Sequence, residues 1–135
     1  DRENQRVQVF NENGKYEDQW VNMSKAAAIS TDNFAQNGLV YVGEYFCGIA
    51  SNDIGTDLGP RISIMNSKGD LLARVGRQSY GNDPGRFYAP HGIAVDSNED
   101  IYVAEVSWSE FGMKLDPPQE LRSMQKLIKV KENQL

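Results

Sequence analysis

Apolar and polar residues alternate along several short stretches of the chain, and the alternation recurs. Residues 6–16 read RVQVFNENGKY, and residues 61–71 read RISIMNSKGDL. In both stretches, β-branched residues occupy alternate positions ahead of an Asn and a Gly, which is the pattern of a half-buried strand followed by a tight turn. Gly14 and Gly69 lie where such a turn needs a positive φ. Each stretch therefore predicts a β-hairpin.

A second pattern also occurs twice, at residues 27–44 and 91–105. Each copy predicts a short apolar strand, an Asp-containing turn and a second apolar strand that ends in a carboxylate, Glu44 or Glu105. Elsewhere, a helical period is confined to the segment from Gln119 to Leu127, which predicts a short helix or a loop.

Because the two patterns alternate, the chain is organised in units of four short strands, and such units repeated around a centre are the blades of a β-propeller. We expect one all-β domain over residues 1–135, a partial β-propeller with four-stranded antiparallel blades. Residues 1–23 would end one blade, residues 24–78 would form a full blade, and residues 79–135 an incomplete blade with an insertion and a C-terminal tail. The nine strands predicted are fewer than the roughly 16 of the smallest closed propeller. Eight side chains are expected between the blades: Val7, Val9, Ile29, Ile62, Ile64, Ile93, Val95 and Ile101.

Composition narrows the classes of function. The hydrophobic content of 39% is that of a globular domain, and the net charge of -5, with Lys and Arg spread along the chain, argues against a nucleic acid partner. No apolar run approaches the roughly 20 residues of a membrane span, and the N-terminus lacks a signal-peptide pattern. The cellular location stays open. The start at Asp1 without an initiator Met is interpreted as a processed product or a fragment.

Two segments carry a resemblance to a known family. DRENQRVQVF followed by NENGKYEDQW resembles an NHL repeat, and residues 81–105, with their PGRF and PHGIAVD motifs, are similar to a second copy. The DREN start and the Pro90-His91-Gly92 motif resemble the propeller lyase domain of peptidylglycine α-amidating enzymes and its bacterial relatives. NHL propellers include both enzymes and binding scaffolds, so the resemblance leaves open whether this chain is an enzyme.

The resemblance also implies a metal ligand. In the amidating lyases, the His of several Pro-His motifs binds zinc in the central channel, and the matching position here is His91, the single histidine of the sequence. One blade earlier, that position is Ala27. Because a catalytic zinc normally needs three protein ligands, zinc is expected only if other chains or a missing half supply the rest. The alternative is an imidazole that bonds to a neighbouring backbone group or faces the channel without metal.

Three carboxylates, Asp1, Glu44 and Glu105, fall at the same place in successive blades. A ring of them is able to hold a cation or a cationic ligand. Alternatively, each forms an ion pair with the Arg of the following strand, which is Arg6 or Arg61 in the first two blades. The exception is Glu105, because Lys126 or Leu127 is expected at its matched position. Glu105 is therefore the strongest candidate for a functional carboxylate.

Two connections are longer than a blade needs. The first runs from Tyr45 to Gly59 and includes Cys47, and the second runs from Val106 to Met124 and includes Trp108 and Phe111. Ordered connections of this length often shape binding faces, and the alternative is a packed loop anchored by Trp108 and Phe111. Cys47 has no histidine in its loop, so a packed thiol is expected there.

We therefore expect an NHL-type propeller module that presents a binding face for a small ligand or another protein. The residues expected on this face are Glu44, Glu105, Trp108 and Phe111. The alternatives are the C-terminal half of a metal-dependent lyase and a self-assembling propeller fragment. In the last case, open blade faces would be covered by other copies, and three copies sharing one axis would bring three His91 side chains together.

Overall fold

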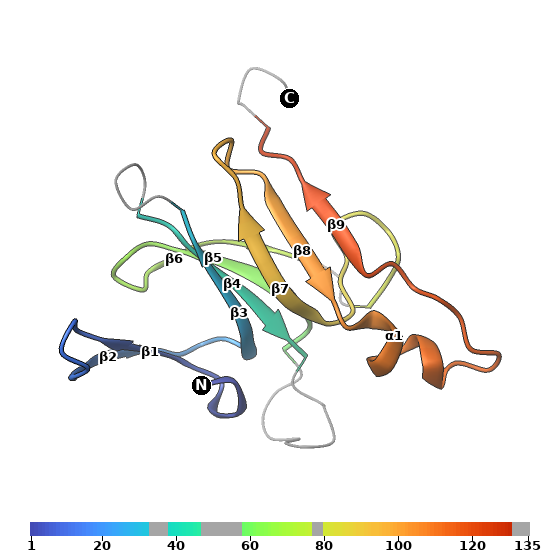
Figure 1. Ribbon diagram of the computed structural model, residues 1–135, viewed down its shortest axis with the longest axis horizontal. Coiled ribbons are helices and arrows are strands. Elements are labelled where there is room, and N and C mark those ends of the chain that lie inside the picture. The colour runs from blue at the N-terminus through green and yellow to red at the C-terminus, as the bar shows by residue number, and fades with distance from the viewer. Residues whose placement is uncertain (33–37, 47–57, 77–79, 131–135) are drawn as a thin grey trace.

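The computed structural model describes residues 1–32, 38–46, 58–76 and 80–130. These residues contain nine strands in three antiparallel sheets, with the orders β1-β2, β3-β4-β5-β6 and β7-β8-β9 (Figure 1). The all-β class and the predicted strand numbers of two, four and three are confirmed. Most of the first long connection, with Cys47, lies outside the described residues. The elements are η1 (Arg2–Asn4), β1 (Val7–Phe10), β2 (Tyr16–Trp20), β3 (Lys25–Thr31), β4 (Val40–Tyr45), β5 (Arg61–Met65), β6 (Leu71–Val75), β7 (Pro90–Val95), β8 (Ile101–Glu105), α1 (Ser107–Glu110), η2 (Gly112–Lys114) and β9 (Met124–Leu127).

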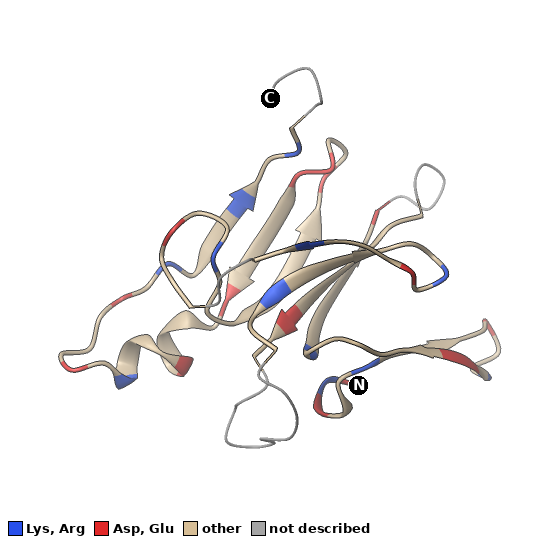
Figure 2. Ribbon diagram, turned by 180° about the vertical axis from the view of Figure 1, so that it is seen from behind, with Lys and Arg blue, Asp and Glu red and all other residues tan. Residues whose placement is uncertain are grey.

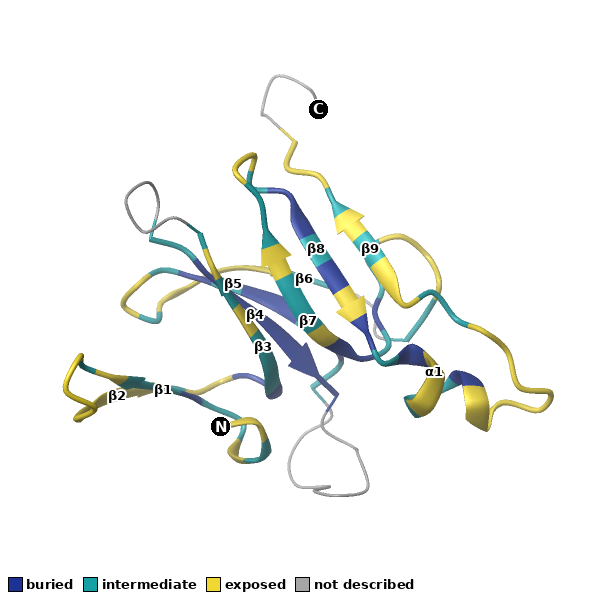
Figure 3. Cartoon of the chain, in the orientation of Figure 1, coloured by how far each residue is buried: buried dark blue, intermediate teal, exposed yellow. Residues whose placement is uncertain are grey.

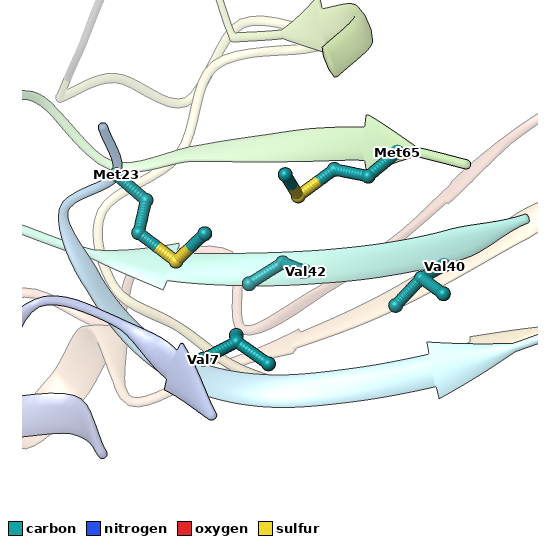
Figure 4. Close-up of a cluster of buried hydrophobic side chains, with 5 residues drawn as sticks. All are labelled: Val7, Met23, Val40, Val42 and Met65. Carbon is teal, nitrogen blue, oxygen red and sulfur yellow. The ribbon is translucent and has the colours of Figure 1, made fainter. Parts of the chain in front are cut away.

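The four-stranded sheet is packed between the other two sheets. On one face it contributes Val40, Val42 and Met65 to a cluster with Val7 of β1 (Figure 4). On the other face Tyr41 and Ile62 pack against β8. Since both faces are covered, every residue of β4 is buried (Figure 3). The core therefore lies in two layers, one on each side of β4.

Three hairpin turns share one side-chain arrangement. In each turn, the side-chain oxygen of the first residue accepts the backbone N–H groups two and four residues later, at 2.9 to 3.1 Å, and these first residues are Asn11, Asn66 and Asp96. The fourth residue of the turn has a positive φ, 76° at Gly14 and 85° at Gly69. The predicted turn glycines are therefore confirmed. The equivalent residue of the third turn is Glu99, with a φ of 64°.

The two turn glycines differ in their surroundings, and this difference is testable. A Cβ at Gly69 would overlap the indole ring of Trp20, whereas nothing lies within 4 Å of a Cβ at Gly14. Both Ala variants strain the left-handed backbone, and only Gly69→Ala also displaces Trp20. We expect a loss in the free energy of unfolding of about 1 kcal/mol for Gly14→Ala and about 2 kcal/mol or more for Gly69→Ala, measured by urea titration. Equal losses would contradict the packing of Trp20 on this turn.

Burial between the sheets agrees with the sequence at most of the predicted positions. Three of the eight predicted residues are buried: Val7, Ile62 and Ile101. Four more are half-buried: Val9, Ile64, Ile93 and Val95. The prediction is wrong for Ile29, which is 50% exposed. Ile29 lines a shallow groove beside β1, because the two-stranded sheet covers only part of the face of the four-stranded sheet (Figure 1).

The segment after the second long connection also differs from the prediction. A short helix or a loop was expected over Gln119–Leu127, and Met124–Leu127 is instead the strand β9, which pairs with β8. The helical turns lie earlier, in α1 and η2. Across the described ranges, no helix has the length and apolar character needed to cross a membrane.

Candidate functional site

The residues singled out in the sequence gather at one end of the second and third sheets, here called the α1 end. Glu44 lies near the end of β4, Glu105 ends β8, and His91 lies near the start of β7. Ala26 pairs with Glu44, and Pro90 pairs with Glu105. Ala27 and His91 therefore hold equivalent positions in the two sheets, in agreement with the alignment of the two sequence repeats.

Glu44 is fully buried and ties β4 to β5 and to Ser24, the residue before β3. Its Oε2 accepts hydrogen bonds from Ser24 N at 2.6 Å and Arg61 Nε at 2.9 Å, and its Oε1 accepts one from the Ser63 hydroxyl. In the first sheet, Asp1 is similarly paired with Arg6, with 2.8 Å between Oδ2 and Nε. The ion pairs considered as the alternative to a ring of ligand-binding carboxylates are thus present at both positions.

Glu105 occupies the equivalent place in the third sheet without an arginine partner on the next strand. Its Oε2 accepts Tyr88 N at 2.6 Å and Ala89 N at 3.0 Å, and Gln125 Nε2 lies 3.4 Å from its Oε1. Burial of Glu105 raises the pKa of its carboxyl above the ordinary value of 4.5, although these hydrogen bonds and Arg122 oppose the shift.

The strand register corrects the residue expected opposite Glu105, at the position matched to Arg61: it is Ser123, whose carbonyl accepts the Glu105 N–H at 2.8 Å, rather than Lys126 or Leu127. Gln125 pairs with Val103 and Ser63 pairs with Val42, so Gln125 replaces Ser63 in the third sheet. Lys126 instead forms an ion pair with Asp100 at 2.8 Å, and Leu127 joins the core. Both buried carboxylates thus hold the backbone of their own sheets, and contact of Glu44 or Glu105 with a ligand stays a prediction.

Five aromatic rings pack together at the α1 end, with Phe111 near their centre. The Phe111 ring centroid lies 5.2 Å from those of Phe46 and Tyr80 and 5.3 Å from that of Tyr88, and Tyr45 stacks on Phe46 at 5.1 Å. Phe111 was a predicted anchor. Tyr80 and Tyr88 were missed, because no repeat or spacing in the sequence relates them to the second long connection.

His91 is exposed beside this cluster, with its ring edge-on to Tyr45 at 6.1 Å. The pKa of the Tyr45 phenol is raised, mainly by burial and to a smaller extent by a hydrogen bond with Glu110 of α1. Within the parts of the chain that the structure describes, no three His, Cys, Asp or Glu residues are grouped to hold a metal ion. These residues therefore do not fit a zinc site, and a metal role for His91 still requires ligands from elsewhere.

The segment Ser107–Leu115 projects from this end (Figure 1). Phe111 packs this segment onto the aromatic cluster. Further along the connection, Gln119 N donates a hydrogen bond to Gly112 O at 3.1 Å. Trp108, expected as a second anchor in the packed-loop alternative, is instead 48% exposed. Met113 and Leu115 are also exposed, at 50% and 42%. The second long connection thus exposes three large apolar side chains.

Comparison with known proteins supports the fold. No curated protein matches the chain, and the similarity to amidating lyases stays a resemblance. Residues 87–109 match the family model of the NHL repeat, and this segment includes β7, β8, His91, Glu105 and Trp108. Together with this NHL repeat, the three stacked antiparallel sheets give the chain the fold of a partial all-β propeller.

Proposed function

We propose that this chain is a propeller-type binding module that recognises an apolar surface of another protein through Ser107–Leu115. The exposure of Trp108, Met113 and Leu115 on one ordered projection carries the proposal. Single exposed apolar residues are ordinary on protein surfaces. Three of them within eight consecutive residues are a local concentration of exposed apolar side chains, and such concentrations are a common feature of interaction sites.

The anchoring of this segment favours binding for a second reason. Phe111 packs against three rings. Tyr45, which stacks on one of these rings, forms a hydrogen bond with Glu110 of the same segment. Because the segment is already folded, a partner would lose little free energy in ordering it. Trp is also among the residues that contribute most to binding energy at protein interfaces. Trp108 is therefore the side chain expected to dominate recognition.

A peptide selection on the purified chain tests this proposal. Peptides from a random phage library would be selected on the wild-type chain, and their affinities for variants measured by calorimetry. We expect Trp108→Ala to weaken binding by about 2 kcal/mol, because it removes the largest exposed side chain of the projection.

Met124→Ala is the control, since Met124 is another exposed apolar residue, 60% exposed against 48% for Trp108, and it lies on β9 rather than on the projection. Peptides that bind both variants as well as they bind the wild type would contradict the proposal. Peptides lost with Met124→Ala and retained with Trp108→Ala would place the binding face on β9 instead.

A further inference from the structure

A polar groove separates the first hairpin from the outer half of the second sheet. It has a volume of about 410 Å³, and its walls include Trp20, Asn22, Ser63, Lys68 and Arg74. This volume lies in the range of small-molecule sites. The groove is built from β2, the connection to β3, and β5 and β6, so it is separate from the α1 end.

One arginine bonds directly to Glu44 beside this groove, and a second is linked to it through a hydroxyl. Arg61 Nε donates to Glu44 at 2.9 Å, and Arg74 Nε lies 3.3 Å from the hydroxyl of Ser63, which itself donates to Glu44. Arg61 lies on β5 and Arg74 on the neighbouring strand β6. Across the ribbon as a whole, basic and acidic residues are scattered over the sheets and their connections (Figure 2). Burial and the nearby Arg61 lower the pKa of Arg74, with Glu44 acting in the opposite direction. The network thus holds one more positive than negative charge.

One donor of this network is left unused. Arg61 Nη2 is buried and has no hydrogen-bond partner in the part of the chain that the structure describes. Arg61 is paired with Glu44 and does not line the groove, so contact with a ligand in the groove falls to Arg74. The hydrogen bonds of Arg74 to Ser63 and to the carbonyl of Asn22 engage two of its five N–H donors. Arg74 is therefore able to donate to a ligand in the groove that it lines.

We infer that this groove binds a small organic monocarboxylate through Arg74. Guanidinium groups bind carboxylates through paired hydrogen bonds, and Arg74 is a groove-lining guanidinium with donors to spare. Asp18 and Asp70 also line the groove, and they disfavour a phosphate, which carries more negative charge. Trp20 and Met65 offer apolar contact to the carbon part of the ligand.

Acetate is the simplest probe, and the side-chain Nε–Hε signals of arginine in NMR spectra report its site. Titration with acetate at constant ionic strength is expected to shift the signal of Arg74 in a saturable manner, with a Kd on the order of 10 mM. The signal of Arg86, which is paired with Asp83 outside the groove, is expected to stay in place. Inorganic phosphate is expected to bind less tightly than acetate.

Two variants and a matched control complete the test. Arg74→Gln is expected to weaken acetate binding at least about tenfold, and Arg86→Gln, which removes the same charge elsewhere, is expected to leave it unchanged. Arg74→Lys keeps the charge but lacks the paired donors, so weaker binding is expected there too. An unchanged Arg74 signal, equal effects of Arg74→Gln and Arg86→Gln, or acetate binding by Arg74→Lys as tight as by the wild type would overturn the inference. Tighter binding of phosphate than of acetate would overturn the assignment to carboxylates.

Discussion

Replacement of Glu44 by Gln is expected to lower the free energy of unfolding by about 3 kcal/mol, because it leaves Arg61, whose side chain is only 15% exposed, without its carboxylate. Glu44 is fully buried, and its Oε2 lies 2.9 Å from Arg61 Nε. Gln keeps the size of the side chain, so the loss measures charge and hydrogen bonding rather than volume. Denaturant titration of the two proteins at neutral pH gives the difference.

Glu105→Gln is the matched control, since Glu105 holds the equivalent position without such an ion pair. Burial raises its pKa in the folded protein above the ordinary value of 4.5. The folded state therefore binds more protons than the unfolded state above this pH, and stability falls as the pH rises from about 4.5 through the folded-state pKa. Glu105→Gln removes this fall, so we expect the variant to gain relative to the wild type as the pH rises.

The comparison of the two variants is decisive for the role of the carboxylates. A loss below about 1 kcal/mol for Glu44→Gln would show that the ion pair with Arg61 adds little to stability. A difference between wild type and Glu105→Gln that does not change with pH would contradict the raised pKa of Glu105.

The features that follow from local chemistry were predictable from the sequence. Gly14 and Gly69 were identified because a tight turn of that length requires a residue with positive φ, and neighbouring residues decide this requirement. The Glu44–Arg61 ion pair was also among the alternatives, since a repeat that places Glu at the end of one strand and Arg at the start of the next brings them together in any antiparallel pair.

The features that depend on distant segments were not predictable. The partner of Glu105 was misplaced because the inserted helical turns of α1 and η2 hide where β9 begins, and a shift of register changes every partner on that strand. Trp108 and Phe111 are both aromatic and close in sequence, and nothing local decides which one packs. Phe111 is half-buried because Tyr80 and Tyr88, from a different connection, lie against it.

Ile29 and Ile62 show the same limit within the core, and they provide the second large effect. Both are β-branched residues in strands of the second sheet, and alternation predicted that both are buried. Ile62 is fully buried between the second and third sheets, whereas Ile29 is 50% exposed where the first hairpin does not reach. The alternation of apolar and polar residues in the sequence indicates which face of the sheet a side chain lies on. The extent of the neighbouring sheet decides whether that face is covered.

Ile62→Ala is therefore expected to lower the free energy of unfolding by about 3 kcal/mol, through lost apolar contact and the cavity left behind. Ile29→Ala, which deletes the same atoms, is expected to cost less than about 1 kcal/mol. Denaturant titration at several protein concentrations checks both values. Similar losses at low concentration would mean that Ile29 is covered within the chain. A loss for Ile29→Ala that grows with concentration would show instead that a second copy of the chain covers the open face of β3.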